Sequence, residues 1–161
     1  MPFSFISPLN SHKMSKKSNV STDLGYYSLY LLRYLKENRF PQAGDAAFIN
    51  ARADRAADTY EQARRDGYPA DGAQEMAMAV LTEGLGLSRW NVMEEVVANE
   101  FSHEVGDADR EAFMERVLPE MDEVFAIYDL TDGGFSQSKE YDDLYNELTG
   151  AVALYIEAYG V

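Results

Sequence analysis

The stretch SKEYDDLYNELTGAVALYIEAY, residues 138–159, decides the fold class. Ser138 is a favourable residue for a helix N-cap. Apolar residues then recur at alternating steps of four and three, close to a 3.5-residue repeat; they are Tyr141, Tyr145, Leu148, Val152, Tyr155 and Tyr159. The pattern predicts one long helix, continuing to about Ala158, that docks lengthwise into a helical bundle. A heptad-like seam also suits a homodimer, so the sequence does not decide whether this stripe belongs to the core or to a dimer interface.

Five further helical segments follow from caps, chain breakers and apolar spacing. The predicted N-caps are Thr22 or Asp23, Asp45, Asp71, Ser88 and Asp107, and Pro119 kinks or ends the fifth segment. The fourth segment is expected to run from residue 89 to residue 105. Strand signals are nearly absent. The sequence therefore predicts an all-α fold, a compact single-domain bundle of five to seven helices over residues 21–161, behind a disordered tail over residues 1–20.

Composition limits the chemistry. The chain has 161 residues, 46% of them hydrophobic, and no cysteine, which excludes disulfides, thiolate zinc sites and cysteine nucleophiles. No stretch approaches the ~20 consecutive apolar residues of a membrane span, so we expect no membrane contact. The cytoplasm is the default compartment.

The charge is distributed unevenly along the chain. Residues 1–65 have a net charge of +4 and residues 66–161 a net charge of −18. Direct nucleic-acid binding is disfavoured, because such proteins usually gather basic residues on one face of a basic domain. A basic protein partner is expected instead, bound by acidic side chains of the second half; the candidates are Glu94, Glu95, Glu104, Asp107 and Asp109. A DNA mimic is a sharper form of this hypothesis, and an acidic surface that only maintains solubility is the simpler alternative.

The motif Glu100-Phe-Ser-His103 is the best candidate for chemistry. On a helix this E-x-x-H spacing would place a carboxylate and an imidazole on one face, as in di-iron bundles. Those bundles need a second such pair, and the other histidine, His12, lies in the predicted tail. We therefore assign no catalytic residue, metal ligand or cofactor, and expect a non-enzyme. The alternative from another class is a small enzyme that uses converging carboxylates with Glu100 and His103.

Three stretches of the chain resemble a known family. They are Tyr26-Tyr27 with Leu29-x-Leu31-Leu32-x-Tyr34-Leu35 and Ala43-Gly44-Asp45-x-x-Phe48-Ile49-x-x-Arg52-Ala53-Asp54, and the ending Tyr141-x-x-Leu144-Tyr145-x-Glu147-Leu148-Thr149-Gly150 with Leu154-Tyr155. Over roughly residues 21–161 the chain resembles an uncharacterised family of small helical proteins from Bacteroidetes, often encoded on conjugative mobile elements. The resemblance implies an all-α fold and an intracellular accessory role. It transfers no catalytic residue, because the family has no established activity.

Overall fold

The structure is a computed structural model and describes residues 25–161. These residues form helices and turns and no strand, so the all-α prediction is confirmed for this part of the chain. Contacts divide them into two compact units: an N-terminal unit of residues 25–37 and 41–83, and a C-terminal unit of residues 38–40 and 84–161. The predicted single domain stays a prediction. The predicted tail and the Thr22 or Asp23 cap lie outside the described residues.

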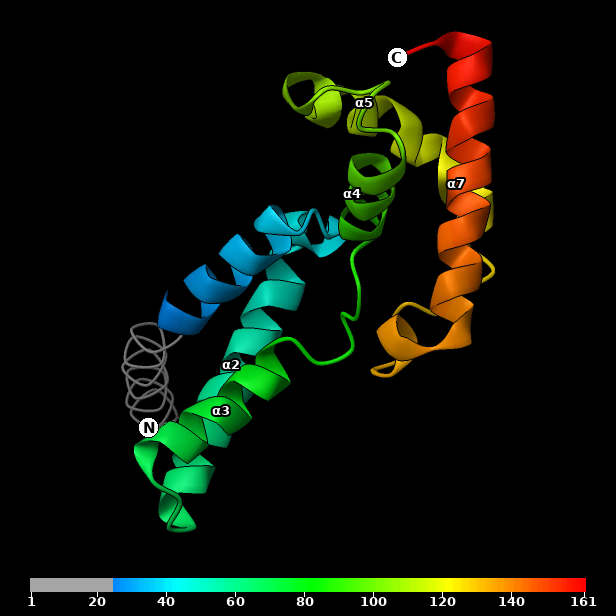
Figure 1. Cartoon of the computed structure of the whole chain (residues 1–161). Coiled ribbons are helices and arrows are strands. Elements are labelled where there is room, and N and C mark those ends of the chain that lie inside the picture. Colours follow the sequence, from blue (N-terminus) through cyan, green and yellow to red (C-terminus); the bar gives the residue numbers. More distant parts are fainter. Residues whose placement is uncertain (1–24) are drawn as a thin grey trace, which may run out of the picture. The chain divides into compact units, whose positions relative to one another are not determined.

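The N-terminal unit contains three α-helices within the described residues (Figure 1). A helix over residues 25–37 is followed by the 3₁₀ turn η1 (Pro41–Gly44), α2 (Ala46–Arg65) and α3 (Ala70–Leu81). The predicted cap Asp45 is confirmed, since its carboxylate accepts a hydrogen bond from the Phe48 N–H at 3.0 Å. The predicted cap Asp71 is wrong. The N-cap is Pro69, two residues earlier, whose fixed φ suits a helix start. Asp71 lies in the first turn, where its charge interacts favourably with the helix dipole.

Most buried residues of α2 and α3, two helices in contact, are alanines. The buried residues are Ile49, Ala53, Ala56 and Ala63 of α2 and Ala73, Ala77 and Leu81 of α3. Because alanine is small, the two helix backbones can approach closely. The larger apolar side chains Phe48 and Tyr60 of α2 are only half-buried. Small residues dominate the packed faces of both helices, and Ile49 and Leu81 are the larger members.

The C-terminal unit is built around α7 (Lys139–Tyr159). It also contains α4 (Arg89–Glu100), η2 (Asp107–Asp109), α5 (Arg110–Val117), η3 (Leu118–Met121), α6 (Asp122–Phe125) and η4 (Phe135–Gln137). The predicted caps Ser88 and Ser138 are confirmed, as each side chain accepts a hydrogen bond from the N–H three residues on. The predicted break at Pro119 is also confirmed, because α5 ends at Val117 and η3 follows.

The core of this unit lies between α7 and α4. Leu144, Leu148 and Val152 of α7 are fully buried and belong to one apolar cluster with Met93 and Val97 of α4. The tyrosines of the predicted stripe flank this line instead of forming its centre; Tyr141, Tyr145 and Tyr155 are half-buried and Tyr159 is 78% exposed. The helices α4 and α7 therefore share a core. The helix over residues 25–37 belongs to the N-terminal unit.

Candidate functional site

The E-x-x-H motif does not lie on one helix. α4 ends at Glu100, Phe101 takes a non-helical conformation with φ −128°, and His103 falls in the turn that follows. The chain turns here because Phe101 and Val105 both enter the core. The prediction of a helix that continues to residue 105 is therefore wrong. Glu100 and His103 are both exposed, and no hydrogen bond or ion pair joins them within residues 25–161. Their use as a polar site of a small enzyme stays a prediction.

Two glutamates of α4 bind tyrosines of α7. The Tyr145 hydroxyl donates to Glu100 at 2.9 Å, and the Tyr141 hydroxyl donates to Glu95. Burial first, and then the bond to the Glu95 carboxylate, raise the pKa of Tyr141. Burial likewise raises the pKa of Tyr145, and the Glu100 carboxylate adds to the effect. These contacts join α4 to α7 across the edge of the core and give Glu95 and Glu100 a role in the fold.

All five predicted partner-binding residues are exposed in the C-terminal unit. Glu94 and Glu95 lie in the middle of α4. Glu104, Asp107 and Asp109 lie within six residues of each other, in the connection from α4 to α5. Asp107 accepts a hydrogen bond from Arg110, so part of its charge is compensated. Within the described residues, Glu94, Glu104 and Asp109 have no ion pair, and their carboxylates remain open to a partner.

Four of the five Lys and Arg residues of the C-terminal unit are held within it. Arg39 pairs with Glu111 at 2.7 Å and lies over the Trp90 ring at 4.2 Å. Arg89 pairs with Asp122 at 3.1 Å, and Arg110 pairs with Asp107. Arg116 lies over the ring of Phe113 at 5.8 Å. The remaining cation is Lys139, at the start of α7.

Against these five cations the C-terminal unit has eighteen Asp and Glu residues, a net charge of −13. The described residues of the N-terminal unit have six cations and nine anions, a net charge of −3. The acidic character predicted for the second half of the sequence is thus a property of one structural unit.

An acidic cluster on α7 was not predicted as a binding surface. Glu140, Asp143 and Glu147 all act on the Tyr128 hydroxyl; burial first, then Glu147 and then the other two carboxylates raise the pKa of Tyr128. The i, i+3, i+7 spacing of the three acids is a sequence signal that could have identified one helix face. Their convergence with Tyr128, which lies after α6, is a tertiary contact that spacing alone does not give.

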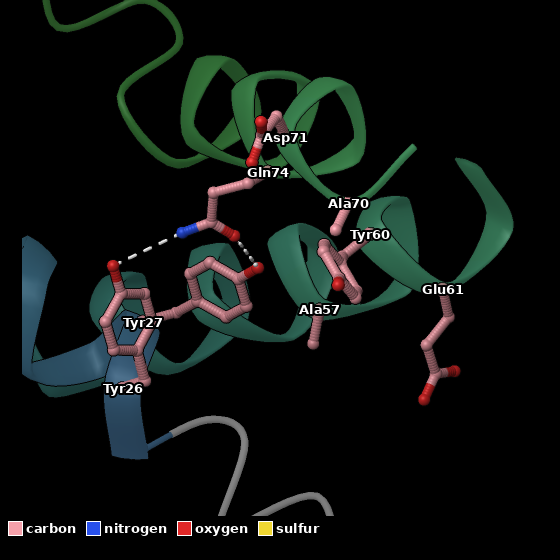
Figure 2. A pocket seen from close by; sticks show the side chains of 8 residues that line it. All are labelled: Tyr26, Tyr27, Ala57, Tyr60, Glu61, Ala70, Asp71 and Gln74. Atoms are coloured by element: carbon pink, nitrogen blue, oxygen red, sulfur yellow. Dashed lines mark hydrogen bonds between the residues drawn. The ribbon is translucent and has the colours of Figure 1, made fainter. Parts of the chain in front are cut away.

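The N-terminal unit contains a pocket of about 500 Å³ between its three helices (Figure 2). Tyr26 and Tyr27 form one wall, with ring centroids 5.2 Å apart in an edge-to-face arrangement, and Tyr60 of α2 contributes a third ring. Gln74 of α3 joins the wall: its amide oxygen accepts from Tyr27 at 2.8 Å and its amide nitrogen donates to Tyr26 at 3.2 Å. Asp71 also lines the pocket. No sequence motif predicted this pocket.

The described residues lack two kinds of feature. No group of three or more His, Asp or Glu side chains is arranged to hold a metal ion in residues 25–161. No helix in that range is both long enough and apolar enough to cross a membrane.

Comparisons with known proteins assign the family. Residues 19–161 match a family model described as a domain of unknown function (DUF1896), whereas the curated proteins contain no match. A solved structure, the crystal structure of protein PG0816 from Porphyromonas gingivalis, is 36% identical with a TM-score of 0.77, over 89% of this chain and 97% of that one. The resemblance to an uncharacterised Bacteroidetes family is confirmed at this level, and the association with mobile elements stays a prediction. The chain belongs to the DUF1896 family, a domain of unknown function.

Proposed function

We propose that the protein is a non-catalytic interaction module whose C-terminal unit binds a basic protein partner. The observation that supports this proposal is that the arginines of the C-terminal unit already have partners within that unit. Its arginines pair with carboxylates or lie over aromatic rings of the same unit, so they do not neutralise the remaining acidic surface. After all five cations are counted, the unit still has a net charge of −13.

Electrostatics favours a basic partner over other classes. A surface whose charges have one sign attracts a partner of opposite charge and speeds their diffusional encounter. This attraction weakens as salt screens the charges. Screening acts over about 8 Å at physiological ionic strength. The same surface repels the phosphates of nucleic acids and the anionic headgroups of membranes. A partner rich in Lys or Arg is the class that gains most from contact with it.

The acidic residues fall into two groups with different roles. Glu95, Glu100 and Asp107 hold Tyr141, Tyr145 and Arg110 within the fold. Glu94, Glu104 and Asp109 have no such bond among the described residues and are exposed. Exposed charges without partners gain the most from a new ion pair and can be neutralised without loss of an internal contact. We therefore assign partner binding first to Glu94, Glu104 and Asp109.

A charge-neutralisation experiment tests the proposal. The tagged protein is used to capture partners from the native host at low and at high salt, and the bound proteins are identified by mass spectrometry. The test variant combines Glu94→Gln, Glu104→Gln and Asp109→Asn. The matched control combines Asp54→Asn, Asp58→Asn and Glu75→Gln, which remove the same charge from exposed positions of the N-terminal unit.

We expect a basic partner that is captured at low salt, released at high salt, lost with the test variant and retained with the control. Equal loss with both triple variants would show that only total charge matters. No partner at either salt would contradict the proposal. The DNA-mimic form is tested on the captured complex: duplex DNA displaces the protein from its partner if the partner's DNA site is occupied.

A further inference from the structure

The tyrosine pocket of the N-terminal unit is distinct from the acidic surface of the C-terminal unit. Six residues define its chemistry: Tyr26, Tyr27, Tyr60, Gln74, Asp71 and Glu61. A volume of about 500 Å³ falls within the usual range of small-ligand sites, roughly 300–1,000 Å³. We propose that this pocket binds an organic cation, an alkylammonium group.

The walls present aromatic faces and edges. Figure 2 shows the rings of Tyr27 and Tyr60 on either side of the space above Ala57, with Gln74 bridging the two tyrosines of the first helix. The face of an aromatic ring is electronegative and attracts a cation, and aromatic-lined sites are used to recognise quaternary ammonium groups. Gln74 fixes the wall in place, because one amide binds both the Tyr26 and the Tyr27 hydroxyl. The pocket is therefore organised before a ligand enters.

The charges around the pocket have one sign. Asp71 and Glu61 line it, and no Lys, Arg or His does so. Glu61 lies near Arg65, at 4.0 Å, and its side chain extends away from the tyrosines in Figure 2, so Asp71 is the more effective anion. Within residues 25–161 Asp71 has no ion pair. A cation in the pocket would be attracted by both the rings and this carboxylate.

An anionic ligand is the alternative to a cation, because α3 begins at the pocket. A helix N-terminus attracts negative charge. Here Asp71, in the first turn of α3, already supplies that charge, and Pro69 at the N-cap position has no N–H to donate. An anionic ligand would meet two carboxylates and no cation. The lining therefore favours a cation over an anion.

Choline and its neutral isostere, 3,3-dimethyl-1-butanol, are the probes, because they share shape and differ in charge. Binding to the full chain is followed by NMR, through the amide signals of Tyr26, Tyr27 and Gln74. We expect choline to bind at least about 5-fold more tightly than the neutral isostere. Tyr60→Leu is expected to weaken choline binding by about 5-fold, and Asp71→Asn by about 2- to 5-fold.

Matched controls separate ring chemistry from folding. Tyr60→Phe keeps the aromatic face and is expected to retain choline binding, whereas Tyr159→Leu removes an exposed ring elsewhere and is expected to have no effect. Equal affinity for the two probes, displacement of choline by acetate, or no choline binding in the millimolar range would each overturn the proposal. Because these readouts use the N-terminal unit alone, they can fail without affecting the proposed function of the C-terminal unit.

One further variant identifies the source of the ammonium group. Lys13, Lys16 and Lys17 precede the described residues in the sequence. If their side chains are the natural occupants, replacing all three with Gln removes a competitor and tightens choline binding. If the natural occupant is a separate molecule, choline affinity is unchanged. Either result supports an organic-cation site.

Discussion

Replacement of Gly86 by alanine tests the packing of the C-terminal unit most severely. Gly86 has φ +65°, a backbone conformation that residues with a Cβ rarely adopt. A Cβ added there would lie 2.0 Å from the Leu130 carbonyl oxygen and 2.6 Å from the Thr131 Cα. Both are backbone atoms, so no side-chain rotation can relieve the overlap. The two chain segments would have to separate.

The expected cost follows from three contributions. The left-handed backbone costs alanine about 1–2 kcal/mol. Separation of the segments breaks the bond from the Leu87 N–H to the Leu130 carbonyl, 3.0 Å long, which costs about 1 kcal/mol or more. Leu85 and Leu130, both buried, lose packing as well, for about 1 kcal/mol. Together these contributions predict a loss of about 3–4 kcal/mol.

Gly84→Ala is the matched control, because Gly84 has φ +76° with no atom within 4 Å of its added Cβ. This variant has the backbone cost alone, about 1–2 kcal/mol. Urea unfolding is followed by fluorescence of Trp90, the single tryptophan, which reports on the C-terminal unit. We expect Gly86→Ala to unfold at a far lower urea concentration than Gly84→Ala, or not to fold at all. A difference of less than about 1 kcal/mol between the two variants would refute the close approach of Gly86 to Leu130.

Three further predictions concern stability. Gly150→Ala, in the middle of α7 with open space at its Cβ, should raise the free energy of unfolding by about 0.5–1 kcal/mol in the same urea assay. Arg52→Ala should destabilise the end of α3 by about 1 kcal/mol, because its guanidinium donates to the Glu83 carbonyl at 2.6 Å; faster hydrogen exchange in the last turn of α3 would show this, and unchanged exchange would contradict it. Since burial and Glu95 raise the pKa of Tyr141 above its usual 10.0, the folded protein retains the phenolic proton longer than the unfolded chain does. The resulting stability is complete below pH 10 and decreases as the pH rises further; Tyr141→Phe should flatten this decrease, and an unchanged slope would argue against the contact.

The sequence predicted those features that depend on local chemistry. Asp45, Ser88 and Ser138 cap helices because a short polar side chain can bind the N–H three residues on. Pro119 ends a helix for an equally local reason. The end of α4 at Glu100 was missed, because the turn depends on burial of both Phe101 and Val105.

The contacts that define the candidate sites are tertiary, so only part of them could be predicted from the sequence. The excess of acidic residues in the second half was visible in the sequence. Which of them bind a tyrosine or an arginine within the fold, and which remain open to a partner, depends on tertiary contacts. Glu95 binds Tyr141 from 46 positions away, while its neighbour Glu94 has no such bond among the described residues. The tyrosine pocket needs three helices to meet, and the Tyr27–Gln74 bond spans 47 positions. Spacing along one helix does not contain this information.

Zero-length crosslinking of the captured complex tests the central claim most directly. A carbodiimide joins a carboxylate to a lysine only where the two are in contact, so the crosslinked peptides identify which acidic residues of this chain meet the partner. We expect crosslinks from the C-terminal unit to lysines of a basic protein, first of all from Glu94, Glu104 and Asp109. These crosslinks should be lost at high salt. Links confined to the N-terminal unit, or a complex that persists at high salt without any link from residues 84–161, would contradict it.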